Sequence, residues 1–405
     1  MDEHRSANIN STDLDEETKQ KLKGDSIGDT LYSASFVIST LQGFSNLKYD
    51  EKTEEDLCFL WDMTLELDVC KLLFELDFPT LATNALETCE QQRLIEILIG
   101  ILANILLADC DNKNITTHQV TMILREFETS NPDILIQLMR FLESIAYAMT
   151  HYINGLGDRV LKHHIQFILN NSQNIKLISE SFKAVEQLTE DFKLSECYVT
   201  HSLLESMIEG FDSGFSVETN TFDDDMECQE QSKIIRIFVR AVANLCEYAS
   251  KYNIVEINLV ITNSTKLFTF FSKIVQHFSK EFNLLPVSPC FMEYISAFYL
   301  IIQTVDFDAV PKECDDLIYV IFNCMCKILI LLHPSESEVA DVNALLTEFI
   351  GYIIYRQEFE FLLSELEAIG PSSLIVVNFL NQEYIKFSFD VEVKLKMLHS
   401  KLIKS

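Results

Sequence analysis

The chain has 405 residues, 48% of them hydrophobic, and carries 62 acidic against 31 basic side chains, a net charge of −31. With only 10 Gly and 7 Pro it lacks the turn residues of a β-sandwich or barrel, so a mostly helical fold is expected. The negative field disfavours nucleic acid and anionic membranes as direct partners and favours basic proteins, unless the acidic side chains serve only solubility.

Residues 1–23 are polar, charged and without hydrophobic periodicity, which predicts a disordered acidic N-terminal tail. This tail has no apolar core and does not have the pattern of a signal peptide. The 11 cysteines are odd in number and scattered, as is typical of reduced thiols rather than of a disulfide framework. The longest apolar run, 317–332, is interrupted by Lys327 and is too short to span a bilayer. We therefore expect a protein of the nucleus, the cytoplasm or both.

The ordered chain is expected to begin at Gly24 with the segment GDSIGDTLYS, residues 24–33, followed by an apolar helix over 35–44. Two interpretations of the segment are open. It is either a cap of extended chain that buries Tyr32 over the first repeat, or a docking epitope for a partner.

A second helix is expected after Thr53, which lies three residues before Asp56 and can cap it. This helix carries Leu57, Leu60 and the only tryptophan, Trp61. Trp61 is either a core residue that closes the N-terminal end of the stack or an exposed anchor, since Trp is enriched at interaction hot spots.

One apolar stretch occurs twice. Residues 93–106 read RLIEILIGILANIL and residues 233–246 read KIIRIFVRAVANLC, with asparagines at Asn104 and Asn244. A recurring apolar helix face is typical of a stacked-helix array, because no single unit can bury its own face. The 140-residue interval fits three units of roughly 40–47 residues, the period of helical repeats.

Further apolar helical segments follow with short loops between them, as antiparallel helix pairs require. Asn131-Pro132 and Ser288-Pro289 are helix-start signals. Residues 210–232 are acidic and contain glycine, which predicts a surface loop inserted into the array. The expected segments are 69–76, 94–108, 134–149, 160–169, 174–190, 234–249, 255–279, 290–304, 316–332 and 339–366.

The C-terminal region 374–396 allows both helix and strand, because its apolar residues from Phe387 to Leu395 alternate with polar ones. An isolated strand in a helical stack would have no partner. We therefore predict that this region is helical.

Three segments in the first 110 residues carry a family resemblance: GDSIGDTLYS, then LCFLWDMTLELDV at 57–69, then RLIEILIGILANIL. In this order and spacing the chain resembles the serum amyloid A-like 1 proteins. The resemblance implies an armadillo-type helical fold, no enzymatic activity, residence in the nucleus and a link to cell proliferation.

The sequence contains no motif that supports an enzyme, a metal site or a cofactor. The glycine turn at 154–158 follows a helix rather than the strand that a phosphate-binding loop needs. His163 and His164 are adjacent and cannot share a helix face, whereas a metal site needs three convergent ligands. An enzyme remains only a remote alternative.

A peptide-binding groove is the second hypothesis. Asn104 and Asn244 resemble the asparagines with which armadillo proteins bind a ligand backbone. The residue four positions earlier, a Trp in those proteins, is here Gly100 or Arg240, and the intervening units have Ser144 and Gln187 instead of Asn. The asparagines could equally satisfy backbone groups between repeats.

These observations predict one armadillo/HEAT-type α-solenoid over residues 24–405. Its expected function is that of a non-enzymatic adaptor for other proteins, with an importin- or chaperone-like carrier of basic cargo as the alternative. The candidate partner-binding residues are Asn104, Asn244, Arg240, Trp61 and Tyr32.

Overall fold

The fold was obtained as a computed structural model of the whole chain. The residues described are 19, 24–45, 49–108, 115–148, 163–215, 226–285, 287, 289–332, 340–383 and 389–403. Within these ranges the regular secondary structure is helical without any strand, and an isolated antiparallel bridge joins Ser26 to Ser33. The predicted all-α solenoid class is confirmed. Apart from Lys19, the tail expected over 1–23 lies outside the described residues.

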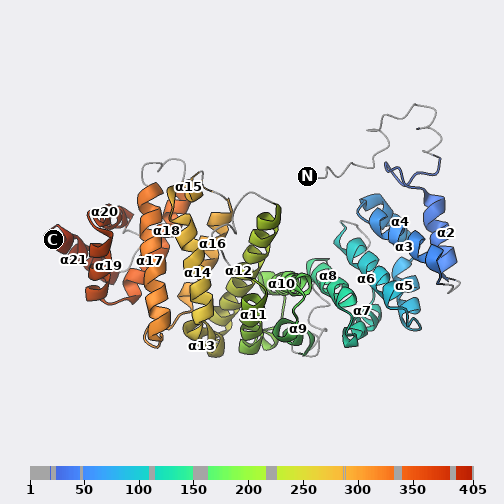
Figure 1. Cartoon of the computed structure of the whole chain (residues 1–405), viewed down its shortest axis with the longest axis horizontal. Helices are drawn as coiled ribbons and strands as arrows, with labels where there is room; N and C mark the ends of the chain where they lie inside the picture. The colour runs from blue at the N-terminus through green and yellow to red at the C-terminus, as the bar shows by residue number, and fades with distance from the viewer. Residues whose placement is uncertain are drawn as a thin grey trace. The chain divides into compact units, whose positions relative to one another are not determined.

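The chain divides into two compact units, one made of 1–168 and 172–198 and the other of 169–171 and 199–405. Each unit is a stack of helices in which equivalent helices of successive repeats pack side by side (Figure 1). The sequence predicts a single repeat domain over 24–405, and helical stacking of this kind occurs within both units. Among the described helices, none combines the length and the apolar character that a bilayer crossing needs.

In the first unit, α6 packs against α3 and α8, and α8 packs against α10. Side-chain hydrogen bonds between these helices join residues 36 to 41 positions apart, which agrees with a repeat of about 40 residues. The helices are α2 (Ala34–Ser45), α3 (Glu51–Met63), α4 (Leu67–Glu75), α5 (Phe78–Leu86), α6 (Gln92–Leu107), α7 (Thr117–Leu124), η2 (Arg125–Glu128), α8 (Pro132–Ala148), α10 (Ile175–Thr189), η5 (Glu190–Phe192) and η6 (Glu196–Tyr198). The residues of α9 (Gln166–Asn171) are divided between the two units.

In the second unit, α12 packs against α16 and α16 against α18, while α14 packs against α17. The hydrogen bonds between the α16 and α12 regions join residues 57 to 62 positions apart, because three helices intervene. The repeats are therefore not of one even length. The helices are α11 (His201–Gly214), α12 (Met226–Tyr252), α13 (Val255–Asn263), α14 (Thr265–Phe278), α15 (Glu281–Leu284), α16 (Pro289–Gln303), α17 (Lys312–Leu332), α18 (Ala340–Arg356), α19 (Phe359–Ile369), α20 (Ser373–Glu383) and α21 (Phe389–Leu402).

Local capping fixes where several helices begin. Pro132 and Pro289 are the first residues of α8 and α16, as their sequence signals predict. The expected cap at Thr53 is wrong, because the Asp50 carboxylate accepts the Thr53 backbone N–H at 2.9 Å and α3 therefore starts earlier, at Glu51. A capping box that the sequence analysis missed joins Thr116 to Gln119 at the start of α7.

The acidic insertion expected over 210–232 is shorter than predicted. Helix α11 continues to Gly214, and α12 already begins at Met226. Gly210 is buried within α11, where a Cβ would lie 2.9 Å from the Leu169 carbonyl oxygen, so this glycine serves close packing rather than a loop. The central part of the insertion, 216–225, lies outside the described residues.

The C-terminal region is helical in its described part, as predicted. In α21, Val391, Leu395 and Leu398 are buried while Val393 is 38% exposed. The buried positions therefore follow the helical period rather than the two-residue alternation that the sequence also allowed.

Candidate functional site

The side chain of Asn104 joins three neighbouring helices of the first unit. Its Nδ2 donates to Thr64 Oγ1 at 2.8 Å, just beyond the end of α3, and its Oδ1 accepts from Arg140 Nη2 of α8 at 2.6 Å. Thr64 Oγ1 in turn donates to the Trp61 carbonyl oxygen at 2.5 Å. The Asn104 amide thus ties repeats together through two side chains, and not through the backbone groups that the sequence analysis named as the alternative.

Trp61 lies against Gly100, the residue four positions before Asn104. A Cβ placed on Gly100 would lie 2.2 Å from Cζ2 of the indole and 2.4 Å from Cε2. The ring therefore occupies the space beside α6 that a side chain at position 100 would need, and Trp61 is half-buried rather than fully exposed. Armadillo peptide grooves carry a Trp four residues before the Asn, and this chain has Gly100 there instead. The ring of Trp61, from α3, lies over that position.

The equivalent of Asn104 in the next repeat is Ser144, as the sequence predicts. Its hydroxyl is within hydrogen-bonding distance of two carbonyl oxygens, Ala103 at 2.9 Å and Arg140 at 2.8 Å. It therefore faces the previous helix rather than a ligand. Gln187 in α10 donates to Glu190 at 2.5 Å. Neither residue continues a ladder of asparagines.

Asn244 and Arg240 belong to α12 of the second unit, whereas Asn104 belongs to α6 of the first. Asn244 is half-buried. Arg240 lies 4.0 Å from the carboxylate of Glu293 on α16, which Arg236 approaches to 3.4 Å. Both arginines of α12 thus approach the same carboxylate of α16.

The Gly24–Ser33 segment is a compact turn that caps the first unit. Asp25 accepts hydrogen bonds from the Ser33 hydroxyl at 2.5 Å and from the Ser35 N–H at 3.0 Å, and Ile27 and Thr30 are buried. The geometry favours the cap over a free epitope.

Tyr32 is half-buried rather than buried. Its ring stands edge-on to that of Phe59, with centroids 6.0 Å apart. Burial, with smaller effects of Glu66 and Asp62, raises the pKa of Tyr32. Phe59 remains 49% exposed, so an aromatic surface is accessible beside the cap.

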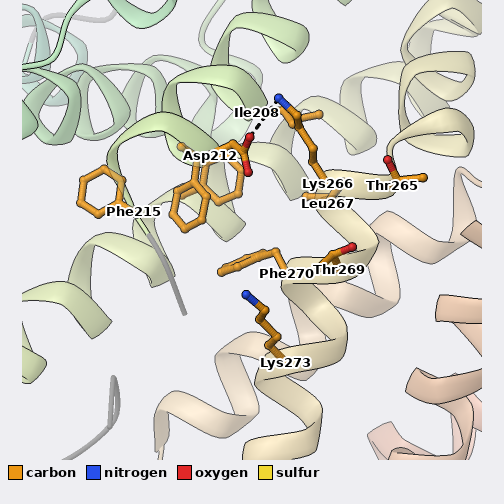
Figure 2. Close-up of a pocket in the computed structure, with 11 residues that line it drawn as sticks. Ile208, Asp212, Phe215, Thr265, Lys266, Leu267, Thr269, Phe270 and Lys273 are labelled. Carbon is orange, nitrogen blue, oxygen red and sulfur yellow. Dashed lines mark ion pairs between the residues drawn. The ribbon is translucent and has the colours of Figure 1, made fainter. Parts of the chain in front are cut away.

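The second unit holds an aromatic cavity that the sequence analysis did not predict. It measures about 360 Å³ and lies among α11, α12 and α14 (Figure 2). Phe211 stacks on Phe238 with centroids 4.1 Å apart and meets Phe270 edge-on at 4.7 Å. The half-buried Phe215 stacks on Phe211 at 5.4 Å. The i, i+4 spacing of Phe211 and Phe215, which places both rings on one helix face, was the sequence pattern that could have predicted this cluster.

Two lysines of α14 lie at the cavity with different partners. Lys266 binds the carboxylates of Glu209 at 2.6 Å and Asp212 at 2.9 Å, as the dashed line to Asp212 in Figure 2 marks. Lys273, two helical turns later, is exposed and makes no ion pair or hydrogen bond with any described residue. The cavity is therefore an apolar recess with an available cation beside it.

Among the described residues, no group of His, Cys, Asp and Glu side chains has the arrangement that a metal ion needs. The buried thiol of Cys246 is 3.7 Å from the Thr304 hydroxyl, and burial raises its pKa to about 12, which disfavours the reactive thiolate.

Comparison with known proteins supports the family resemblance at low identity. No family model matches the chain. Protein saal1 of Danio rerio is 25% identical over 208 residues, and Protein SAAL1 of Homo sapiens is 26% identical over 193 residues. These matches cover 46% and 41% of this chain but only 44% and 40% of the relatives, so the chain matches less than half of their length. The similarity to serum amyloid A-like 1 proteins is confirmed as a distant one.

Two solved structures align with this chain at low similarity. An engineered protein aligns with 98% of this chain and 97% of its own at a TM-score of 0.43 and 12% identity. A circular tandem repeat protein aligns with 87% of this chain and 76% of its own at a TM-score of 0.26 and 15% identity. This likeness is too slight to say anything about function.

Proposed function

We propose that the chain is a non-enzymatic adaptor whose helical repeats hold other proteins. The observation that carries the proposal is the aromatic cavity of the second unit, because a recess with preformed apolar walls can take a partner side chain without first reorganising. The distant SAAL1 relatives carry no enzyme name, which agrees with a scaffold role.

The chemistry of the cavity specifies the partner segment. Its walls of phenylalanine rings suit an aliphatic or aromatic side chain, which would be removed from water. The available ammonium of Lys273 beside them suits a carboxylate on the same segment. We therefore propose a protein partner that presents an apolar residue flanked by Asp or Glu.

A bulky substitution at the cavity tests this proposal. Thr269 is exposed on α14 and lines the cavity, so Thr269→Trp should fill the recess with little loss of stability. Gln276→Trp, on the same exposed face two turns further along and not lining the cavity, is the matched control. Proteins captured by the full chain should be identified for both variants by quantitative mass spectrometry.

We expect Thr269→Trp to lose a defined group of proteins that both the unmodified chain and Gln276→Trp retain. Lys273→Glu should lose the same group, because it reverses the charge beside the cavity. Equal capture by all four proteins would reject the cavity as the docking site.

The alternative function is a carrier of basic cargo, which the net charge of −31 favours. Binding that depends on this exposed charge should weaken steeply as the salt concentration rises. An adaptor that docks through the cavity should keep most of its affinity at high salt, so a salt titration of a purified complex separates the two functions.

The cellular role is proposed from the family resemblance alone. We propose that the protein acts in the nucleus, the cytoplasm or both and supports cell proliferation. Imaging of the tagged full chain and growth curves of depleted cells test this. Unchanged growth after depletion would contradict the proposed role.

A further inference from the structure

Among the residues that the structure describes, the side-chain partners of Arg140 on α8 are neutral groups. Its Nη1 donates to Gln137 Oε1 at 2.7 Å and its Nη2 to Asn104 Oδ1 at 2.6 Å. Asn104 is itself fixed by its bond to Thr64, so three elements orient the guanidinium. These two amide oxygens accept hydrogen bonds but do not neutralise the charge.

This arrangement differs from that of Arg93 and Lys183 in the same unit. Arg93 pairs with the Glu96 carboxylate at 2.8 Å, and Lys183 pairs with Glu180 at 2.7 Å. Arg140 makes no ion pair with any residue that the structure describes, although the chain has 62 acidic residues. A guanidinium also has more N–H donors than two oxygens can use.

A third feature places an apolar contact near this cation. Tyr147 lies seven residues after Arg140, on the same face of α8, and is 62% exposed. Along the helix the separation is about 10 Å. An extended peptide covers about 10 Å with three residues.

We infer that Arg140 binds a side-chain carboxylate of an acidic peptide segment in a protein partner, with an apolar residue of that segment, about three positions away, on Tyr147. A planar guanidinium matches a carboxylate with two parallel hydrogen bonds, and a preoriented one loses little freedom on binding. A doubly charged phosphate normally recruits several cations, whereas a carboxylate can be bound by the single guanidinium of Arg140. The site belongs to the first unit and does not rest on the aromatic cavity.

The probe is a fluorescein-labelled peptide with three repeats of Glu-Gly-Ser-Leu, bound to the full chain and followed by fluorescence anisotropy. Arg140→Gln should weaken its binding about 10- to 100-fold, the range for hydrogen bonds to charged groups. Arg140→Lys should bind with intermediate affinity, because it keeps the charge but loses the two-pronged geometry. Arg93→Gln, which removes an arginine that is already paired, should leave binding unchanged.

Thermal unfolding of each variant separates a loss of binding from a loss of folding. If Arg140→Gln is poorly folded, the affinity of Arg140→Lys for the probe tests the inference instead. Equal losses in Arg93→Gln and Arg140→Gln would overturn the inference, since general electrostatics would then explain binding. The inference would also be overturned if a peptide with Gln in place of Glu bound equally well, or if one with phosphoserine in place of Glu bound more tightly. Failure of the unmodified chain to bind the probe would overturn it as well.

Discussion

The indole of Trp61 lies so close to Gly100 that no side chain fits between α3 and α6 at this level, since a Cβ on Gly100 would fall 2.2 Å from the ring. The two residues come from two separate segments of the family resemblance, LCFLWDMTLELDV and RLIEILIGILANIL. Their contact gives a physical reason for both segments to occur in one chain: the large ring of one repeat requires the glycine of the next.

Gly100→Ala should therefore destabilise the protein. The methyl group must displace a rigid ring within packed helices, which costs about 1–3 kcal/mol. This outweighs the gain of about 1 kcal/mol that alanine brings to a helix. The free energy of unfolding in urea measures the balance.

Gly43→Ala is the control for Gly100→Ala. Gly43 lies in α2, and a Cβ there would meet nothing within 4 Å. It should stabilise the protein by about 0.4–1 kcal/mol. If both substitutions stabilise alike, the Trp61 ring does not pack on Gly100.

The fold could be predicted from the sequence because local sequence patterns indicate stacked helices. Apolar runs with a helical period, few glycines and prolines, and starts such as Pro132 depend on nearby residues only. The uneven repeat length and the true start of α12 at Met226 could not be predicted in this way. The polar sequence before Lys233 looks like a loop, yet the Glu and Gln residues at 227 and 229–231 tolerate a helix well.

The candidate sites were harder to predict, because each depends on residues far apart in the chain. Asn104 is recognisable in the sequence, but its partners Thr64 and Arg140 are 40 and 36 positions away. The aromatic cavity likewise combines Phe211 with Phe270 from a different helix. Hydrophobic periodicity shows which face of a helix is apolar. It does not show which side chains of other helices pack against that face.

The bond between Asn104 and Thr64 should contribute to stability. Asn104→Ala removes the donor to Thr64 and the acceptor of Arg140, which should cost about 1–3 kcal/mol because partly buried polar groups lose their partners. In a double-mutant cycle with Thr64→Val, the coupling energy should be about 0.5–3 kcal/mol. An uncoupled pair, or an Asn104→Ala variant as stable as the parent, would instead leave Asn104 available for a ligand.

Lys394 should stabilise the end of α18. Its ammonium donates to the carbonyl oxygens of Ile354 and Tyr355, both at 3.0 Å, and of Gln357 at 2.7 Å. These oxygens lie at the C-terminal end of the helix, where backbone carbonyls lack intrahelical partners and attract positive charge. Lys394→Met should lower the free energy of unfolding by about 1–3 kcal/mol.

Lys396→Met is the matched control for Lys394→Met. The side chain of Lys396 is 68% exposed and pairs with Glu392 one turn away on α21. An exposed pair of this kind contributes about 0.3–0.5 kcal/mol. Chemical unfolding measures the free energy of unfolding of both variants. Equal decreases in the two variants would contradict the capping role of Lys394.

The buried thiol of Cys246 should make the protein less stable in alkali. Burial raises its pKa to about 12, whereas a thiol in an unfolded chain has a pKa of about 8.5. Above about pH 8.5 the unfolded chain releases a proton that the folded protein keeps, so unfolding becomes more favourable. The stability that the protonated Cys246 thiol contributes is fully present below about pH 8.5. It is lost as the pH rises toward 12, by up to about 1.4 kcal/mol per pH unit.

The slope of unfolding free energy against pH, between about 8.5 and 10.5, tests this thiol. Cys246→Ala should lower stability at every pH, because it leaves a cavity, but should give a shallower slope than the parent. Cys197→Ser, which removes an exposed thiol, is the control and should leave the slope unchanged. An identical slope in Cys246→Ala and the parent would mean that Cys246 ionises as readily in the folded protein as in the unfolded chain, and its burial within α12 would have to be reconsidered.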